Sequence, residues 1–286
     1  MKFTFLYVTR NDNYCGDAPL RFKTSLLNLV SQLSNFEFLK KHVEILVVDW
    51  NSDIPIKDHT YLQNFNKQDI DLKYLIVPPN IAKKYNKKGP VSEVHAYNVG
   101  VRFSSGRYIL RVDQDILIGP RFLQYLTTHD PNDNELLWCS RRDIPPSEFL
   151  PEQVIHLVYD DPVLFIHKFS NKIQLWHTVH CNEPNIYDGN GAVGIFGFSK
   201  NIWYKIGGYH EHLTGWGHME VELKKYFLLH NCYWNNLHDV IDCNFYHLYH
   251  TTHTNQEREM NSEIFPPRNQ DNTWGLVDDL QNLNLV

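Results

Sequence analysis

The chain has 286 residues, of which 42% are hydrophobic and 14% aromatic, enough to bury the core of one large domain or two closely joined halves. Its net charge is -6, and it has no Lys/Arg-rich run. A nucleic-acid-binding surface needs clustered cations, so we expect no nucleic acid among the partners.

Hydropathy and cysteine content bear on where the chain resides. No stretch approaches the roughly 18 consecutive apolar residues that a membrane-spanning helix requires. The five cysteines are odd in number and lack close pairs, which suits a reducing compartment better than a disulfide framework. The sequence therefore predicts a cytoplasmic protein without a membrane span.

The first 115 residues alternate strand-like and helix-like segments. Strands are predicted at 3–9, 43–49, 72–77 and 108–112, with a helix at 91–104 before the last of them. Residues 43–48 are apolar at both odd and even positions, apart from Glu44, which indicates a strand covered on both faces. We expect an α/β fold with a mostly parallel, Rossmann-like sheet flanked by helices, in which residues 1–115 form the nucleotide-binding half.

The second half is less regular. Prolines interrupt residues 132–185, which predicts a loop-rich insertion with a candidate lid at 145–162. Regular signals return in a strand at 192–198 and helices at 200–206 and 220–229. We expect a single domain over 1–250, with 116–250 as the acceptor half. A tail over 251–286 would be packed on it through Phe265, Trp274 and Leu276.

Two carboxylates, Asp113 and Asp115, directly follow the strand predicted at 108–112. Open α/β sheets bind ligands at the carboxyl ends of their strands. A nucleotide diphosphate leaves poorly from a sugar unless a cation such as Mn²⁺ or Mg²⁺ bridges its phosphates, and carboxylate oxygens bind such cations. Because Asp-x-Asp is also common on protein surfaces, the pair needs context.

The segment 96–115 supplies that context. It reads Ala-Tyr-Asn-Val-Gly-Val, then Ser-Gly-Arg-Tyr, then an apolar strand that ends in Asp-Gln-Asp. This pattern resembles the signature of family 2 glycosyltransferases and their GT-A relatives. The resemblance implies a GT-A fold and a nucleotide-sugar donor, with uridine as the base, and it implies that Asn98, Asp113 and Asp115 contact the donor.

Two further strand ends match the same family. Val-Val-Asp-Trp-Asn-Ser at 47–52 is similar to the second-strand end at which an aspartate reads the base, here Asp49, although Trp50 and Asn51 replace the usual second Asp and Gly. Thr9 and Arg10 stand where the first strand meets base and ribose in such enzymes. A plain polar strand end remains the alternative for these two residues.

The segment 207–223 is the second strong match. It is similar to the Gly-Gly-(Phe/Tyr)-x-Glu and Gly-Trp-Gly-x-Glu-Asp patterns of inverting galactosyltransferases and chondroitin-type polymerases. The resemblance implies that Glu220 is the catalytic base. It also implies acceptor contacts, which are expected at Asn190, Gly215, Trp216 and Gly217. Met219 replaces the first acidic residue, which predicts a different acceptor.

Glu220 also has a simpler interpretation. Together with Glu222 it would lie in the first turn of the helix predicted at 220–229, where carboxylates stabilise a helix by themselves. Glu222 should point elsewhere on the helix than Glu220 and is expected to be supportive.

A histidine cluster at 245–253 resembles the His-Leu-x-His step after the last core strand of GT-A enzymes, where one imidazole completes the metal site begun by Asp115. In an extended segment His247 and His250 face opposite sides, so only one of them, His247 by preference, is expected at the metal. A zinc site that includes His177, His180 and Cys181 is the alternative, although the spacing fits no closed motif.

These features together predict a metal-dependent, inverting glycosyltransferase that moves a sugar from a UDP-sugar to a hydroxyl group of a glycan or glycoconjugate. A sugar nucleotidyltransferase is one alternative, but it would need a glycine-rich, Arg-containing loop after the first strand, where this chain has only Gly16. A catalytically silent carbohydrate-binding relative is another, and it would not need Glu220.

Overall fold

A computed structural model describes residues 2–59, 62, 69–86, 88–144, 152–169, 193–215, 217–243, 245–248, 250 and 272–286. The strands are β1 (Phe3–Thr9), β2 (Val43–Trp50), β3 (Asp71–Val77), β4 (Tyr108–Val112), β5 (Ile116–Ile118), β6 (Glu135–Asp143), β7 (Val193–Ser199), β8 (Tyr233–Asn236), β9 (Phe245–His247) and β10 (Asn284–Leu285).

The helices are α1 (Ala18–Leu33), α2 (Glu37–His42), α3 (Pro79–Tyr85), α4 (Glu93–Phe103), α5 (Pro120–Thr128), α6 (Glu152–Asp160), α7 (Pro162–Phe169), α8 (Lys200–Ile206), α9 (Met219–Leu229) and α10 (Leu237–Ile241), with 3₁₀ turns η1 (Ile56–Asp58) and η4 (Val277–Asn282). Among the helices described, none is both long and apolar enough to cross a membrane.

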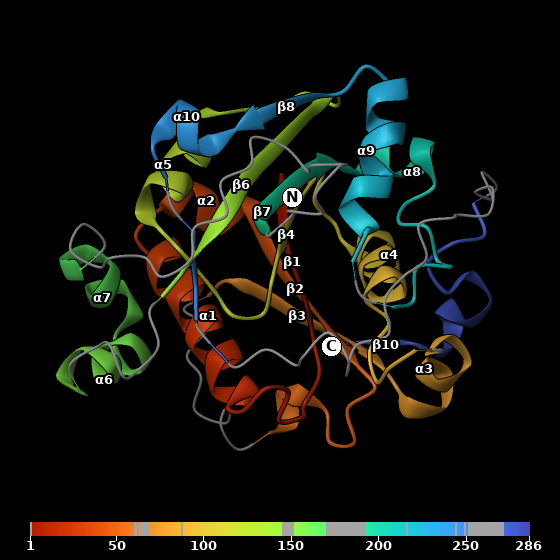
Figure 1. Cartoon of the computed structure of the whole chain (residues 1–286), viewed down its shortest axis with the longest axis horizontal. Coiled ribbons are helices and arrows are strands. Elements are labelled where there is room, and N and C mark those ends of the chain that lie inside the picture. The colour runs from red at the N-terminus through yellow and green to blue at the C-terminus, as the bar shows by residue number, and fades with distance from the viewer. Residues whose placement is uncertain are drawn as a thin grey trace.

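The described strands join one 10-stranded sheet in the order β10-β3-β2-β1-β4-β7-β6-β9-β5, with β8 paired to β6. β1 lies between β2 and β4 and is parallel to both, and β3 continues the parallel half beyond β2. β7 then pairs antiparallel with β4 and with β6. Helices cover both faces: α1 and α5 lie on one side of the sheet, and α4, α8 and α9 on the other (Figure 1).

β1 shows why these residues form a central strand. Phe3, Phe5 and Tyr7 belong to the core cluster that includes residues of α1 and α5, whereas Leu6 and Val8 belong to the cluster beneath α4 and α8. A strand that buries both faces is continuously apolar in sequence. The predicted α/β domain with a mostly parallel sheet between helices is therefore confirmed.

Two glycines of the 96–115 motif are needed for close packing. A Cβ on Gly100 would lie 2.6 Å from Leu6 Cδ1, and one on Gly106 would lie 2.6 Å from backbone atoms of Phe3 and Thr4. Contacts of that length are repulsive. The Asn-x-Gly and Gly-x-Tyr steps of the motif thus bring α4 and the start of β4 directly against β1.

The region 132–185 is more regular than the predicted loop-rich insertion. It contains β6, which pairs with β7, β8 and β9 inside the sheet, and the helices α6 and α7. Pro162 does not interrupt a helix, because it is the first residue of α7, where a missing backbone N–H costs no hydrogen bond. Residues 145–151, most of the candidate lid's first half, lie outside the described residues.

The C-terminal segment packs on the domain. β10 pairs antiparallel with the outer side of β3. Trp274 and Leu276 are buried, and the Arg102 guanidinium lies 4.2 Å above the Trp274 ring while its Nε donates to the Trp274 carbonyl at 2.6 Å. Phe265 lies outside the described residues. The division into two halves and a tail stays a prediction.

Candidate active site

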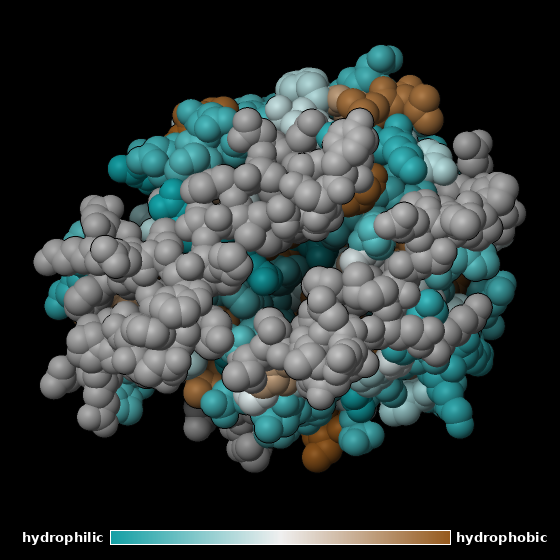
Figure 2. Space-filling view, viewed as in Figure 1, coloured by the Kyte–Doolittle hydropathy of each residue, from teal (hydrophilic) through white to brown (hydrophobic). Residues whose placement is uncertain are grey.

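Polar side chains follow β1, β2 and β4 at their carboxyl ends. The Thr9 hydroxyl donates to Gln114 Oε1 at 2.6 Å, and Arg10 Nε donates to the Asn51 carbonyl at 3.0 Å. On the face shown in Figure 2, hydrophilic residues are visible near the centre of the molecule. The carboxyl ends of the parallel strands are where open α/β sheets bind ligands.

A candidate metal centre is formed by Asp115, His247 and His250. One ligand atom from each lies within 4.8 Å of the other two, with His247 Nε2 3.5 Å from Asp115 Oδ1 and His250 Nε2 3.4 Å from Asp115 Oδ2. The cluster follows from the sheet: β5 pairs with β9, which places Ile116 opposite His247, and Leu248 N donates to the Asp115 carbonyl at 2.9 Å. One carboxylate and two imidazoles suit a divalent transition metal, so the residues fit the predicted ion.

The structure places His247 and His250 on the same side of the chain, beside Asp115, although the sequence predicted that they face opposite sides. That prediction assumed an extended segment in which alternate residues face opposite sides. β9 ends at His247, so the alternation does not continue to His250. Both imidazoles therefore lie beside the same carboxylate.

A buried arginine borders this cluster. Arg21 of α1 is 2% exposed, and its Nε lies 3.5 Å from Asp115 Oδ2. Its other nitrogens donate to the carbonyls of Gly16 and Tyr14. Burial by itself would raise the pKa of Asp115, but the two histidines outweigh burial and hold the pKa well below its ordinary value.

Asp113 has different surroundings from Asp115. Its side chain is 25% exposed, and the Tyr97 hydroxyl donates to its Oδ1 at 3.4 Å. Arg111 and Arg141 lie 3.4 and 4.0 Å from its carboxylate oxygens. Of the Asp-x-Asp pair, only Asp115 belongs to the three-residue cluster found among the described residues.

Glu220 lies in the first turn of α9, which follows a sharp turn in the chain. Gly217 and His218 have φ of 83° and 63°, a left-handed conformation just before the helix starts. The Glu220 side chain is 12% exposed and forms an ion pair with Arg111. The Tyr209 hydroxyl donates to the same carboxylate at 3.1 Å. A carboxylate at a helix N-terminus is favoured by the helix dipole.

The neighbours of Glu220 on α9 are turned inward. Met219 packs in the hydrophobic core, and Glu222 is 2% exposed. Met219, which replaces an acidic residue of the matched pattern, thus serves packing. Glu220 is the more exposed of the two carboxylates in this turn.

Asn98 and Asp49, both predicted to contact the donor, are engaged within the chain. Asn98 is fully buried, its Nδ2 donates to the Tyr209 carbonyl and to Glu211, and its Oδ1 accepts from Tyr209 N at 2.8 Å. Asp49 accepts from Ser52 Oγ and from the backbone N of residue 56. Burial raises the pKa of Asp49. These contacts favour a structural role for both side chains.

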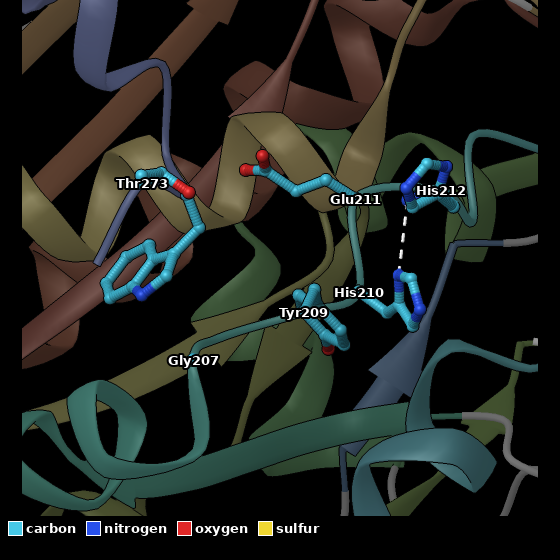
Figure 3. A pocket seen from close by; sticks show the side chains of 7 residues that line it. Gly207, Tyr209, His210, Glu211, His212 and Thr273 are labelled. Atoms are coloured by element: carbon cyan, nitrogen blue, oxygen red, sulfur yellow. Dashed lines mark hydrogen bonds between the residues drawn. The ribbon is translucent and has the colours of Figure 1, made fainter. Parts of the chain in front are cut away.

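A small cavity lies beside the Tyr209 segment. It measures about 110 Å³ and is lined by Gly207, Tyr209, His210, Glu211, His212, Thr273 and Trp274 (Figure 3). Burial, opposed by hydrogen bonds from Asn98 and Gly275, raises the pKa of Glu211. Ligand pockets measure roughly 300–1,000 Å³, so we assign no substrate to this cavity.

Several predicted residues are outside the described part of the chain. Trp216 and Asn190, expected at the acceptor, are among them, and so are His177, His180 and Cys181 of the alternative zinc site. Gly215 and Gly217 are described and flank position 216 directly before α9.

Sequence reasoning missed Arg111 and Arg21. Both are basic residues that the fold buries beside carboxylates of the site. Arg111 left one signal, a charge inside the apolar run of β4, where an unpaired cation would be costly. Arg21 left none that distinguishes it from an ordinary surface arginine of an amphipathic helix.

Comparison with known proteins identifies the fold. No family model matches the chain, and no curated protein sequence matches it. Among solved structures, S. aureus TarS 1-349 has a TM-score of 0.53 at 16% identity over 87% of this chain and 60% of that one. The complex of TarS 1-349 with UDP has a TM-score of 0.51 at 18% identity, over 87% and 61%.

GalNAc-T7 with UDP, GalNAc and Mn²⁺ has a TM-score of 0.54 at 11% identity, over 87% of this chain and 43% of that one. The chain therefore spans less than two thirds of the length of these structures. These neighbours are GT-A glycosyltransferases, and the mixed α/β domain described above has their fold.

Proposed function

We propose that this chain is a metal-dependent, inverting glycosyltransferase that transfers a sugar from a UDP-sugar to a hydroxyl group of a glycan or glycoconjugate. The observation that carries the proposal is the gathering of Asp115, His247 and His250 at the carboxyl edge of a GT-A sheet. Neighbours of this fold were solved with UDP, and one of them with Mn²⁺.

On the donor side, Asp115, His247 and His250 would hold the metal ion. Two imidazoles favour a transition metal such as Mn²⁺ over Mg²⁺, which prefers oxygen ligands. When bound, the ion would act as a Lewis acid that stabilises the departing nucleoside diphosphate. Thr9, Arg10 and Asp113 would contact the donor at the ends of β1 and β4.

On the acceptor side, Glu220 would be the general base. Its carboxylate would take the proton of the attacking hydroxyl while the hydroxyl oxygen bonds to the anomeric carbon and the bond to the diphosphate breaks on the opposite face of the sugar. A single displacement of this kind inverts the anomeric configuration. Gly215, Trp216 and Gly217, which precede α9 in the chain, would bind the acceptor sugar, and Asn190 is proposed to bind it too.

Nucleotide release tests the proposal. Purified protein is incubated with a panel of UDP- and GDP-sugars, with candidate glycan acceptors, and with either Mn²⁺ or a chelator, and the nucleoside diphosphate formed is measured. We expect release from one UDP-sugar that needs metal and is lost in Asp115→Ala. Asp278→Ala, which removes an exposed carboxylate of η4, serves as the matched control and should behave like the wild type.

Two other outcomes would redirect the assignment. If the protein binds a donor with metal but releases no diphosphate with any acceptor, the silent carbohydrate-binding alternative is favoured. If release proceeds equally in chelator and in Asp115→Ala, the metal-dependent mechanism is wrong.

A further inference from the structure

Arg111 is a buried cation in the middle of the fold. It belongs to β4, whose other residues are apolar apart from the Tyr108 hydroxyl, and it is 4% exposed. A buried guanidinium is tolerated only when its charge is paired and its N–H groups are hydrogen-bonded. The partners of Arg111 therefore indicate its role.

Those partners come from both sides of the candidate site. Arg111 Nη1 donates to Glu220 Oε1 and to the Tyr209 hydroxyl, the latter at 2.6 Å, and Nη2 lies 3.4 Å from Asp113 Oδ1. The guanidinium also stacks on the Tyr97 ring, with its central carbon 4.4 Å from the ring centroid. One planar group thus touches the proposed base and the first carboxylate of the Asp-x-Asp pair.

The hydrogen bonds to Glu220 are one-sided. Within the described residues, Arg111 and Tyr209 both donate to Oε1. Tyr209 in turn accepts from Arg111, so the three groups form a closed triangle. This arrangement fixes the carboxylate through one oxygen and leaves Oε2 for another partner.

The neighbouring groups also favour the protonated, positively charged form of the Arg111 guanidinium. Burial by itself would lower the pKa of Arg111, but the adjacent tyrosine hydroxyls and carboxylates hold it well above its ordinary value. The guanidinium is planar and presents its N–H donors in a fixed geometry, unlike the ammonium group of a lysine. Its stacking on Tyr97 further restricts its rotation.

We infer that Arg111 is a positioning residue, which orients Glu220 so that Oε2 receives the acceptor proton and which holds the base at a fixed place relative to Asp113. This inference rests on the proposed role of Glu220 as general base. Arg111 acts through Glu220 and does not itself contact the reacting atoms.

A double-mutant cycle on kcat tests the inference. Arg111→Lys keeps a charge but loses the planar fork, and we expect kcat to fall about 10- to 100-fold, less than the roughly 10²–10⁴-fold attributed to a general base. The KM for the UDP-sugar and its metal dependence should stay within about twofold. In a Glu220→Gln background, the same change at Arg111 should lower kcat by less than about twofold, because the residues act as a unit.

Two further variants guard against a purely structural effect. Arg102→Lys alters another arginine stacked on aromatic rings, away from Glu220, and should leave kcat unchanged. Tyr209→Phe keeps the guanidinium and removes one hydrogen bond to Glu220. Should Arg111→Lys fail to fold, as judged by thermal unfolding, the cycle is run with Tyr209→Phe, and its kcat loss should likewise disappear in the Glu220→Gln background.

The outcomes separate this inference from the proposed function. A wild type that transfers no sugar removes both. In the second outcome the wild type is active and Glu220→Gln lowers kcat, but the change at Arg111 or Tyr209 lowers kcat by the same factor with and without Glu220. This outcome is consistent with the proposed function and overturns the positioning role. A kcat of Arg111→Lys within twofold of the wild type overturns it as well.

Discussion

Metal binding should stabilise the protein through Asp115 and not through Asp113. A ligand that binds only the folded state adds RT ln(1 + [L]/Kd), which is about 2.7 kcal/mol at a metal concentration of 100 Kd. Domains of this size gain roughly 2–4 °C in Tm per kcal/mol. Mn²⁺ should therefore raise the Tm of the wild type by about 5 °C, taking the lower end of that range for a long chain.

The isosteric variant Asp115→Asn removes one of the three ligands and should abolish this shift. It should also lower the Tm without metal, because Arg21 loses the buried carboxylate that lies 3.5 Å from its Nε. Breaking a buried pair by removing one partner costs roughly 3–5 kcal/mol. The quantity to compare is thus the difference in Tm with and without Mn²⁺ for each protein, in which the baseline change cancels.

Asp113→Asn is the matched control, since it changes the same residue type two positions away and outside the cluster. Differential scanning fluorimetry with a Mn²⁺ titration gives the three shifts. We expect the full shift in Asp113→Asn and none in Asp115→Asn. A full shift in Asp115→Asn, or its loss in Asp113→Asn, would refute the assignment of the cluster.

Three further outcomes are expected. Glu220→Gln should lower kcat by about 10²–10⁴-fold while the donor KM is retained, as steady-state kinetics with the active UDP-sugar will show, and an unchanged kcat would exclude it as the base. Gly106→Ala should lower the free energy of unfolding by about 1–3 kcal/mol in urea denaturation, because the new Cβ would meet backbone atoms at 2.6 Å, whereas Gly89→Ala, with its nearest atom at 4.0 Å, should be nearly neutral. Because the folded state raises the pKa of Glu211, its contribution to stability is present below its unfolded pKa near 4.5 and is lost as the pH rises through the folded pKa. Glu211→Gln should remove that loss. The test is the Tm of both proteins from pH 4.5 to 8, and an equal slope of Tm against pH in the two would contradict the assignment.

The parallel half of the sheet was predictable because burial on two faces leaves a continuous apolar run. β1 and β2 are such strands, and every residue of both is buried. β6 was not recognised, although it lies inside the sheet, because its second half is charged. Arg141 from that half lies 4.0 Å from Asp113, so one of the charges that concealed the strand lies beside the candidate site.

The candidate site was only partly predictable for a related reason. Asp115 follows β4 and His247 is the last residue of β9, and both lie in segments that the motifs define, whereas the position of His250 depends on where β9 ends. Arg111 and Glu220 are 109 positions apart, and their contact depends on how α9 lies over β4. Local spacing carries no information about such a pair, so the positioning of the base emerged only from the fold.

The pairing of β10 with β3 has a consequence for how the molecule meets its neighbours. Without β10, β3 would be the outermost strand of the parallel half. The edge of an uncovered strand exposes backbone N–H and C=O groups that can pair with a strand of another molecule. Asn284 and Leu285 lie opposite Ile76 and Leu75, and residue 286 exchanges two backbone hydrogen bonds with Tyr74. Residues 284–286 thus cover part of the β3 edge and leave fewer of its backbone groups for pairing with another molecule.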